Sequence, residues 1–221
     1  MFENAVNKVC SSIFPIFAVT RPGDAKSTHV VGTGFFIGKA GRFITANHVM
    51  SGVPAGTTFW YGGNIPASWL PRMLQIREVF SDPKADLFVG DVPGQQLPPL
   101  QVAQSVPKPG KSVCLCGYPL PKVSTSGEAV VTRDIRQYWQ PTSVVDFLNA
   151  SGEGVRFDGF ITQHASLRGM SGGPVFDVAG VVFGVDQGCM HRQAVEVRVD
   201  NGLVIGVGTI RASIGAVVPL D

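Results

Sequence analysis

Three side chains in this sequence have the chemistry that a nucleophilic hydrolase requires, and each stands beside a strand-like run. Ser171 lies in the segment LRGMSGGPVFD, His48 follows the apolar run RFITA, and Asp86 precedes the apolar run LFV. A serine hydroxyl becomes a nucleophile when a histidine accepts its proton and a carboxylate orients that histidine. We therefore predict that His48, Asp86 and Ser171 form one catalytic site.

The residues around Ser171 indicate how the negative charge that develops during such a reaction is stabilised. In the segment GMSGG, the backbone N–H groups of Gly169 and Ser171 are expected to converge on one point and form the oxyanion hole of a tetrahedral intermediate. Gly169 allows the backbone to turn there at low steric cost. We also expect Gly172 and Gly173 to leave space beside the nucleophile, and Pro174 to direct the chain into the next strand.

The elements that must position these residues are short strands. About a dozen runs rich in Val, Ile and Phe are bounded by Gly, Pro, Asp or Asn, and the 27 glycines and 16 prolines fall largely between them. This pattern predicts an all-β sandwich or barrel. We expect hairpins that turn at residues 38–41 and at Asn201–Gly202, a short helix or turn before the first strand, and a short closing helix at residues 210–220. Residues 92–110 are expected to connect two sub-barrels.

The composition excludes several classes of protein. Of the 221 residues, 44% are hydrophobic and 15% are charged, which provides a core and argues against disorder. The formal net charge of +2 without a basic cluster argues against nucleic-acid binding. No apolar run is long enough to span a bilayer, and the N-terminal segment lacks the positive lead of a signal peptide. We therefore expect no nucleic-acid or membrane partner and a cytoplasmic location.

The segments GTGFFI, TANHV, ADLFV, GMSGGPV and GVVFGVD occur in this order. Together they resemble the histidine, aspartate and serine segments of the chymotrypsin-like (trypsin-fold) serine peptidases, particularly the HtrA/DegP-type and glutamyl-endopeptidase-type branches. The resemblance covers residues 32–186. It implies one peptidase domain over residues 1–221, with two six-stranded antiparallel β-barrels at 1–100 and 101–221 and the active site between them. It also implies a serine endopeptidase that acts on a protein or peptide substrate through an acyl-enzyme intermediate, without a cofactor or metal.

Two departures from the family pattern affect how activity would be controlled. Digestive members pair a new N-terminus with an aspartate just before the nucleophile, but Met170 stands at that position and no Ile-Val-Gly-Gly start is present. We therefore expect a protein that is made ready to act, or one that is gated by loop ordering or by an activating partner. Residues 119–153 are the candidate gate, expected as a long loop region near the cleft. The PDZ domain that follows the barrels in HtrA-type enzymes is expected to be absent.

Substrate selection is expected to depend on two segments, HASLR before the serine and GVDQGC after it. They contribute His164, Ser166 and Asp186 to the predicted substrate-binding residues. A carboxylate of Asp186 that points into the pocket would favour Lys or Arg in the substrate. His164 or His191 would instead favour an acidic residue or glutamine.

The sequence is also compatible with three alternative interpretations. The motif G-x-S-x-G also marks the nucleophile elbow of α/β-hydrolases, but that fold needs a helix after the serine, whereas Pro174 and strand-like runs follow here. A barrel of the same fold without catalysis would act as a binding or scaffold module. Finally, Cys114, Cys116, Cys189 and His191 have ligand types that suit a structural zinc ion, although buried reduced thiols are the simpler interpretation.

Overall fold

The computed structural model describes residues 1–20, 27–61, 74–119, 122–126, 129–133, 135–152, 155–200 and 203–219. The helical elements are α1 (Glu3–Val9), the 3-10 turn η1 (Cys10–Ser12) and α2 (Asn47–Ser51). No helix in these described ranges is both long and apolar enough to cross a membrane. The strands are β1 (Ile13–Thr20), β2 (Ser27–Phe36), β3 (Arg42–Ala46), β4 (Thr58–Tyr61), β5 (Leu74–Gln75), β6 (Arg77–Asp82), β7 (Leu87–Asp91), β8 (Ser112–Gly117), β9 (Lys122–Ser126), β10 (Ala129–Arg133), β11 (Tyr138–Gly152), β12 (Val155–Thr162), β13 (Pro174–Phe176), β14 (Val182–Asp200) and β15 (Leu203–Pro219).

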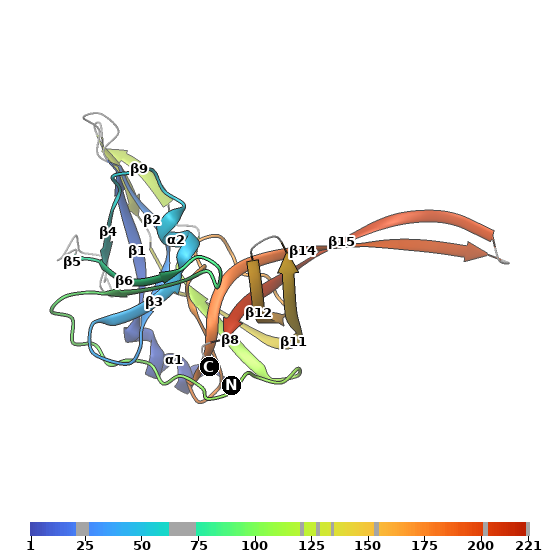
Figure 1. Ribbon diagram of the computed structural model, residues 1–221, viewed down its shortest axis with the longest axis horizontal. Coiled ribbons are helices and arrows are strands. Elements are labelled where there is room, and N and C mark those ends of the chain that lie inside the picture. The colour runs from blue at the N-terminus through green and yellow to red at the C-terminus, as the bar shows by residue number, and fades with distance from the viewer. Residues whose placement is uncertain are drawn as a thin grey trace.

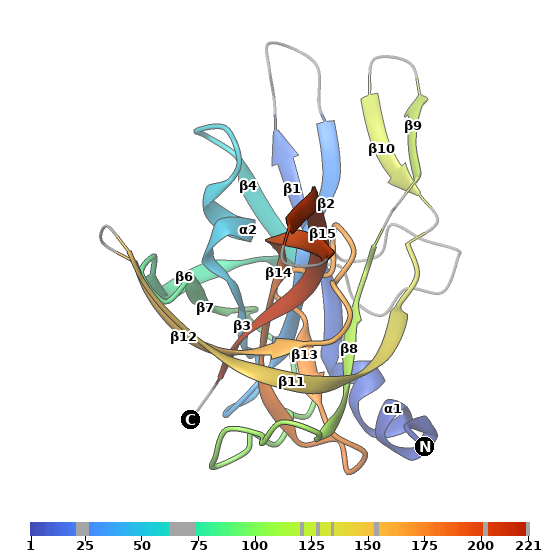
Figure 2. The ribbon, with the colours of Figure 1, turned by 90° about the vertical axis from the view of Figure 1, so that its right-hand side faces the viewer.

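The first sheet curls round on itself. Along its main path the order of the described strands is β5-β4-β1-β2-β3-β7-β6. Its two end strands, β5 and β6, are separated only by Ile76, so one segment of chain pairs with β4 on one side and with β7 on the other. This segment completes the first barrel. The hairpin of β9 and β10 joins the same sheet through a parallel contact between β10 and β2 (Figure 2).

The second sheet is a closed barrel in the order β11-β12-β15-β14-β13-β8, and all of its neighbouring strands run antiparallel. Beyond the barrel, β14 and β15 continue together as a long two-stranded ribbon that projects from the molecule (Figure 1). The expected all-β fold with two antiparallel barrels is therefore confirmed.

Aromatic rings fill the first barrel. The ring of Phe14 lies 4.8 Å from that of Phe36, 5.3 Å from that of Phe43 and 4.7 Å from that of Tyr61, measured between centroids. The three phenylalanines are at most 1% exposed. Buried rings of this kind contribute strongly to stability because each removes a large apolar area from water. The core of this barrel thus holds rigidly the strands that end at the candidate site.

Strand β8 divides the two cores. Cys114 and Cys116 belong to the larger apolar cluster, which includes the aromatic rings of the first barrel, whereas Val113 and Leu115 belong to the cluster of the second barrel. Successive side chains of a strand point to opposite faces, so one strand can serve both cores. The two cysteines therefore share one face of the strand and contribute to one core.

The two predicted hairpins are confirmed, since β2 pairs with β3 and β14 pairs with β15. Residues 201 and 202 themselves lie outside the described residues. The closing helix expected at residues 210–220 is wrong, because strand β15 extends to Pro219. Residues 210–219 pair with residues 184–194 of β14, and this cross-strand pairing overrides the weak local helical pattern. The long loop region expected at residues 119–153 is also wrong, because the strands β9, β10 and β11 lie there.

Candidate active site

The pairing of β3 with β7 places His48 beside Asp86. In this antiparallel pair Ala46 is opposite Leu87, so His48 lies just beyond the end of one strand and Asp86 just before the start of the other. The chain then turns into α2, and the Asn47 N–H donates a hydrogen bond of 2.9 Å to the Asp86 carbonyl. Two short strands of one barrel thus bring the imidazole and the carboxylate together.

The Asp86 carboxylate binds His48 at two points. Its Oδ1 accepts a hydrogen bond of 2.8 Å from the backbone N–H of His48, and its Oδ2 lies 2.7 Å from Nδ1 of the ring. Asp86 adopts a φ of 52°, and no other non-glycine residue in the described ranges has a positive φ. Aspartate tolerates this left-handed conformation better than most residues. When the Nδ1–H group donates this hydrogen bond to the carboxylate, Nε2 keeps a free lone pair that can accept a proton.

The pKa of His48 is raised above the usual histidine range. The largest cause is the hydrogen bond to Asp86; burial opposes it, and the charges of Asp86 and Asp186 add to the increase. The side chain of His48 is 47% exposed and that of Asp86 is 26% exposed. The imidazolium form is thus stabilised by two carboxyl groups while the ring stays accessible. A general base in such a reaction becomes positively charged, so this environment favours proton uptake.

Ser171 lies in a tight loop, here called the nucleophile loop (residues 167–173). The Met170 N–H donates to the Leu167 carbonyl at 3.0 Å, and the Gly173 N–H donates to the Met170 carbonyl at 2.9 Å. Gly169 has a φ of +98°, which glycine adopts without the penalty of a Cβ atom. Among the described residues, the N–H groups of Gly169 and Ser171 have no hydrogen-bond acceptor. The two predicted oxyanion donors are therefore not used inside this part of the fold.

Several contacts bring the nucleophile loop to His48 and Asp86. A Cβ atom on Gly172 would lie 2.9 Å from the backbone nitrogen of Ala46, two residues before His48. A Cβ atom on Gly188 would lie 3.7 Å from Ser171 Oγ, and the neighbouring Gln187 side chain donates a hydrogen bond of 3.3 Å to the Asp86 carbonyl. These contacts place the segment around Ser171 next to the segments that carry His48 and Asp86, and the hydrogen bonds of the described residues include none between Ser171 Oγ and His48.

The glycines beside Ser171 have a different surrounding from the one expected. A Cβ atom on Gly172 would lie 2.0 Å from Thr45 Oγ1 and 2.3 Å from the Thr33 carbonyl oxygen, and one on Gly173 would lie 2.0 Å from the Cys116 carbonyl oxygen. These glycines therefore do not leave open space beside the nucleophile. They allow the loop to pack directly against the neighbouring strands.

Asp186 is fully buried against the nucleophile loop. Its carbonyl accepts a hydrogen bond of 2.6 Å from the Gly172 N–H, and its N–H donates to the Gly173 carbonyl at 2.8 Å. Its Oδ1 accepts a bond of 3.0 Å from the Gly188 N–H. Burial raises the pKa of Asp186 to about 7, while the Gly188 N–H, the nearby Ser166 hydroxyl and the charge of His48 act in the opposite direction. Asp186 is 0% exposed, so charge selection of substrates by this residue stays a prediction.

The other two predicted substrate-binding residues lie on the approach to the nucleophile loop. Ser166 is half-buried, and its hydroxyl lies near the Asp186 carboxyl without forming a hydrogen bond to another described residue. His164 is exposed. Its N–H donates to Thr142 Oγ1 at 3.2 Å, and its carbonyl accepts a bond of 3.0 Å from Thr162 Oγ1. Ser166 therefore lies beside Asp186, whereas His164 is exposed to solvent.

The thiols of β8 are part of the core. Cys114 and Cys116 are at most 1% exposed, and burial raises the pKa of Cys114 to about 12 and that of Cys116 above its ordinary value. Buried thiols of raised pKa are poor nucleophiles and poor metal ligands. No group of three or more His, Cys, Asp or Glu side chains suited to a metal ion occurs within the described part of the chain. The side chains of Cys189 and His191 lie outside it.

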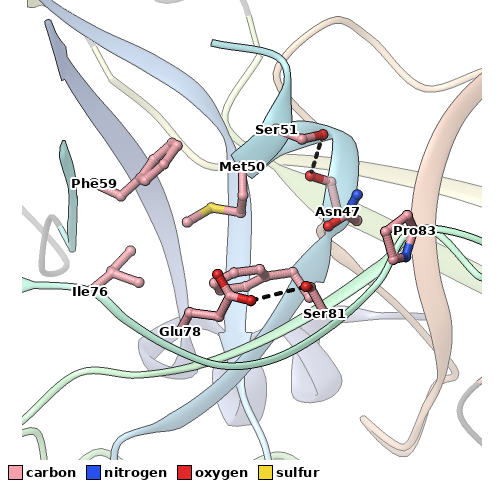
Figure 3. A pocket seen from close by; sticks show the side chains of 9 residues that line it. Asn47, Met50, Ser51, Phe59, Ile76, Glu78, Ser81 and Pro83 are labelled. Atoms are coloured by element: carbon pink, nitrogen blue, oxygen red, sulfur yellow. Dashed lines mark hydrogen bonds between the residues drawn. The ribbon is translucent and has the colours of Figure 1, made fainter. Parts of the chain in front are cut away.

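A pocket of about 440 Å³ lies beside α2 (Figure 3). Met50, Phe59, Ile76 and Phe88 form its apolar part, and polar groups such as Ser51 stand around them. Neither Ser171 nor Asp186 lines it. This pocket therefore lies within the first barrel, and among its lining residues only Asn47 is a direct neighbour in sequence of a predicted catalytic residue.

Two residues that the sequence-based prediction did not assign a role, Thr33 and Thr45, connect this site across the barrels. The Thr33 N–H donates to the Ser171 carbonyl at 2.9 Å, and the Thr45 hydroxyl donates to the Thr33 carbonyl at 2.7 Å. Thr33 and Thr45 belong to two of the segments that carry the family resemblance, GTGFFI and TANHV. These segments indicate the family, but the sequence does not show which atoms the two threonines contact.

Comparison with known proteins agrees with this geometry. A family model described as a trypsin-like peptidase domain matches residues 32–185. Two serine proteases of Mycobacterium tuberculosis, MT3772 from strain CDC 1551 / Oshkosh and Rv3671c from strain ATCC 25618 / H37Rv, are each 30% identical to the chain over 217 residues. The matches cover 93% of this chain and 49% of each relative. The chain thus spans about half the length of the curated relatives it matches.

Solved structures share the fold. The active form of the Rv3671c protease from M. tuberculosis superposes with a TM-score of 0.67 at 22% identity, over 98% of this chain and 79% of that one. The HtrA-type protease AlgW with a tripeptide superposes with a TM-score of 0.65 at 19% identity, over 100% of this chain and 60% of that one. At these identities the likeness establishes the two-barrel architecture.

Proposed function

Since this chain belongs to the trypsin-like peptidase domain family, we propose that it is a serine endopeptidase that hydrolyses peptide bonds with His48, Asp86 and Ser171. The observation that carries the proposal is the two-point contact between Asp86 and His48. One carboxylate binds both the backbone and the ring of the histidine, which sets the ring orientation and its tautomer. That arrangement is what a general base beside a serine nucleophile needs.

The proposed reaction proceeds in two halves. Ser171 Oγ attacks the carbonyl carbon of the scissile peptide bond while His48 Nε2 takes the hydroxyl proton, and the N–H groups of Gly169 and Ser171 stabilise the oxyanion. The protonated His48 then gives its proton to the leaving amine, which yields the acyl-enzyme. A water molecule attacks the ester in the second half, again with His48 as base, and Ser171 is released with a free hydroxyl.

For substrate selection we propose that Asp186 favours a Lys or Arg side chain, with Ser166 at the approach to its carboxyl. The support is the position of Asp186 between the nucleophile loop and Gly188 and the nearness of Ser166. A cationic side chain that reaches this carboxyl would stabilise its ionised form by charge pairing. Profiling with a peptide library should show a basic preference that Asp186→Asn reduces.

Labelling with a fluorophosphonate probe tests the proposed function, because the probe reacts with a serine whose hydroxyl is activated and whose oxyanion hole is formed. We expect the chain to be labelled and to cleave a peptide library, and we expect Ser171→Ala to do neither. If the folded wild-type chain is not labelled and cleaves nothing, the endopeptidase proposal fails. The chain would then be a binding or scaffold module.

A further inference from the structure

We propose that Thr33 is a positioning residue that holds the nucleophile loop in its working conformation from the opposite barrel. The inference deepens the proposed function and rests on it for its catalytic part. Thr33 is fully buried in β2 and contacts the loop at two carbonyls. Its N–H donates to the Ser171 carbonyl at 2.9 Å, and its hydroxyl donates to the Gly169 carbonyl at 2.9 Å.

These two carbonyls belong to the residues whose N–H groups are the predicted oxyanion donors. Each of these residues, Gly169 and Ser171, therefore has the peptide group on its C-terminal side fixed by the same threonine. The contact matters most at Gly169, because a glycine with a φ of +98° has no side chain that would prevent rotation of the neighbouring peptide groups. A hydrogen bond from outside the loop supplies the constraint that the loop itself lacks.

The Thr33 hydroxyl has a defined orientation. A threonine hydroxyl usually rotates to suit its surroundings, but here its oxygen accepts a bond of 3.1 Å from the Tyr118 N–H. The hydroxyl proton is consequently directed to the Gly169 carbonyl. Since the group is buried, no water can replace it. Loss of the hydroxyl would leave both the Gly169 carbonyl and the Tyr118 N–H without this partner, and buried polar groups without partners are costly.

Thr45 extends this contact toward the histidine. Its hydroxyl donates to the Thr33 carbonyl at 2.7 Å, and it lies in β3, which ends two residues before His48. Gly172 packs onto the same place, because a Cβ atom there would clash with both Thr45 Oγ1 and the Thr33 carbonyl. The strand that leads to the general base and the loop that carries the nucleophile thus meet at one pair of buried threonines.

Two substitutions separate the hydroxyl from the shape of the residue. Thr33→Val keeps the shape and removes the hydroxyl, whereas Thr33→Ser keeps the hydroxyl. We expect Thr33→Val to lower kcat by about 10- to 100-fold, since small displacements of reacting groups cost that much, while KM changes by less than about threefold. Thr33→Ser should stay within about threefold of wild type in both constants.

Amide hydrogen exchange measures the position of the loop independently of catalysis. The N–H groups of Met170 and Gly173 are hydrogen-bonded within the loop, and that of Gly172 is bonded to the Asp186 carbonyl, so their exchange reports the opening of the loop. We expect Thr33→Val to speed exchange in a peptide that covers residues 167–173 by at least about tenfold, and Thr33→Ser to restore it. Should the wild-type chain prove inactive, the proposed function fails and the exchange result still decides the role of Thr33.

Ser12→Ala is the matched control. Ser12 is also fully buried, and its hydroxyl donates a bond of 2.7 Å to the Pro98 carbonyl, far from the site in sequence. We expect this variant to lower the thermal stability in the same way as Thr33→Val, but to leave kcat and the exchange of the nucleophile loop unchanged. A kcat loss in Ser12→Ala equal to that in Thr33→Val would overturn the proposal, because the effect would then be general.

The proposal is also overturned if folded Thr33→Val keeps its kcat within about threefold and its loop exchange at the wild-type rate. If Thr33→Val does not fold, Thr45→Val takes its place, since it removes the bond that holds the Thr33 carbonyl but keeps the Thr33 side chain. We expect about a three- to tenfold loss of kcat and faster loop exchange. Unchanged values of both in Thr45→Val would then overturn the proposal.

Discussion

His48 and Asp86 are held by contacts inside the first barrel, whereas the loop that carries Ser171 depends on contacts that cross between the barrels. The histidine and the aspartate follow from one antiparallel pairing, β3 with β7, and are bound to each other directly. The nucleophile loop is held by Thr33 from β2 and by Asp186 from β14. One half of the site is therefore local to a single barrel, and the other half is assembled from three distant segments.

This difference indicates where the site is vulnerable. The pairing of His48 with Asp86 survives as long as the first barrel is folded, because its ladder sets the distance between the two side chains. The position of Ser171 relative to His48 also requires that the barrels keep their mutual orientation. Substitutions at the contacts between the barrels should therefore change catalysis without unfolding either barrel.

The largest effect should come from Asp86→Asn, which disrupts the local half of the site. The carboxylate accepts two hydrogen bonds from His48, and an amide offers one acceptor oxygen and one NH2 group. The NH2 group is a donor, so it would face either the backbone N–H of His48 or Nδ1 of its ring. In the second case Nδ1 must act as an acceptor, and the proton moves to Nε2, which can then no longer accept the proton of the serine. We expect kcat to fall by about 10⁴-fold while Asn still tolerates the left-handed backbone. Steady-state kinetics on a cleaved peptide measures the loss.

Asp91→Asn is the matched control for this substitution. Asp91 ends the same strand β7 and pairs with Arg42, with 2.5 Å between Arg42 Nε and Asp91 Oδ1. Its activity should remain near that of wild type, because a partly exposed ion pair away from the site contributes little. If Asp86→Asn retained a tenth or more of the wild-type kcat, another group would have to orient His48.

A smaller catalytic effect, with a clear loss of stability, is expected from Gly172→Ala at the contact between the barrels. The added Cβ atom would lie 2.0 Å from Thr45 Oγ1, and the residue has a φ of +85°. We expect a loss of about 2–4 kcal/mol in the free energy of unfolding, together with slower labelling by a fluorophosphonate probe. Denaturant unfolding measures the change in stability, and labelling of the purified folded variant measures the change in reactivity.

Gly94→Ala is the control that separates the backbone strain of a positive φ from the steric clash of the added Cβ atom. Gly94 has a φ of +79°, and a Cβ atom there would meet nothing within 4 Å. This control should show only the conformational cost and no slowing of labelling. Equal effects in the two variants would mean that the close approach of the loop to Thr33 and Thr45 has no bearing on the site.

The smallest effect concerns pH and the buried Asp186. Its charge contributes to the raised pKa of His48, so Asp186→Asn should move the acid limb of kcat/KM to lower pH. Stability should change as well. The pKa of Asp186 is about 7 in the folded chain against 3.8 as the ordinary value, so the folded state holds a proton that the unfolded state loses between these values. The stability of the wild-type chain therefore falls as pH rises through this window.

Asp186→Asn does not titrate, so its melting temperature relative to wild type should increase from pH 4 to pH 8. Thermal melts across this range and pH profiles of kcat/KM test the two expectations separately. An acid limb that does not move in the variant would show that Asp186 and His48 do not interact, and the charge of Asp186 would then have no part in the site.

The all-β class and the candidate catalytic residues were within reach of sequence reasoning for physical reasons. Short runs of β-branched and aromatic residues separated by glycine and proline have few other uses than strands and turns. His48 and Asp86 each stood at a strand end, where a polar side chain is exposed to a neighbouring strand end. The closing helix at residues 210–220 was wrong because the partner strand β14 decides the conformation of that segment, and no local pattern reports a partner.

The residue types and their order along the chain by themselves determined the fold class and the family, and they were enough to predict the three candidate catalytic side chains. The tertiary structure alone decided how the nucleophile loop is held, that Gly172 packs on Thr33 and Thr45, and that Asp186 is buried with a raised pKa. The physical reason is distance along the chain. Chemistry and local propensity are properties of a residue and its neighbours, whereas burial and hydrogen bonding between residues such as Thr33 and Gly169 exist only after two barrels have come together.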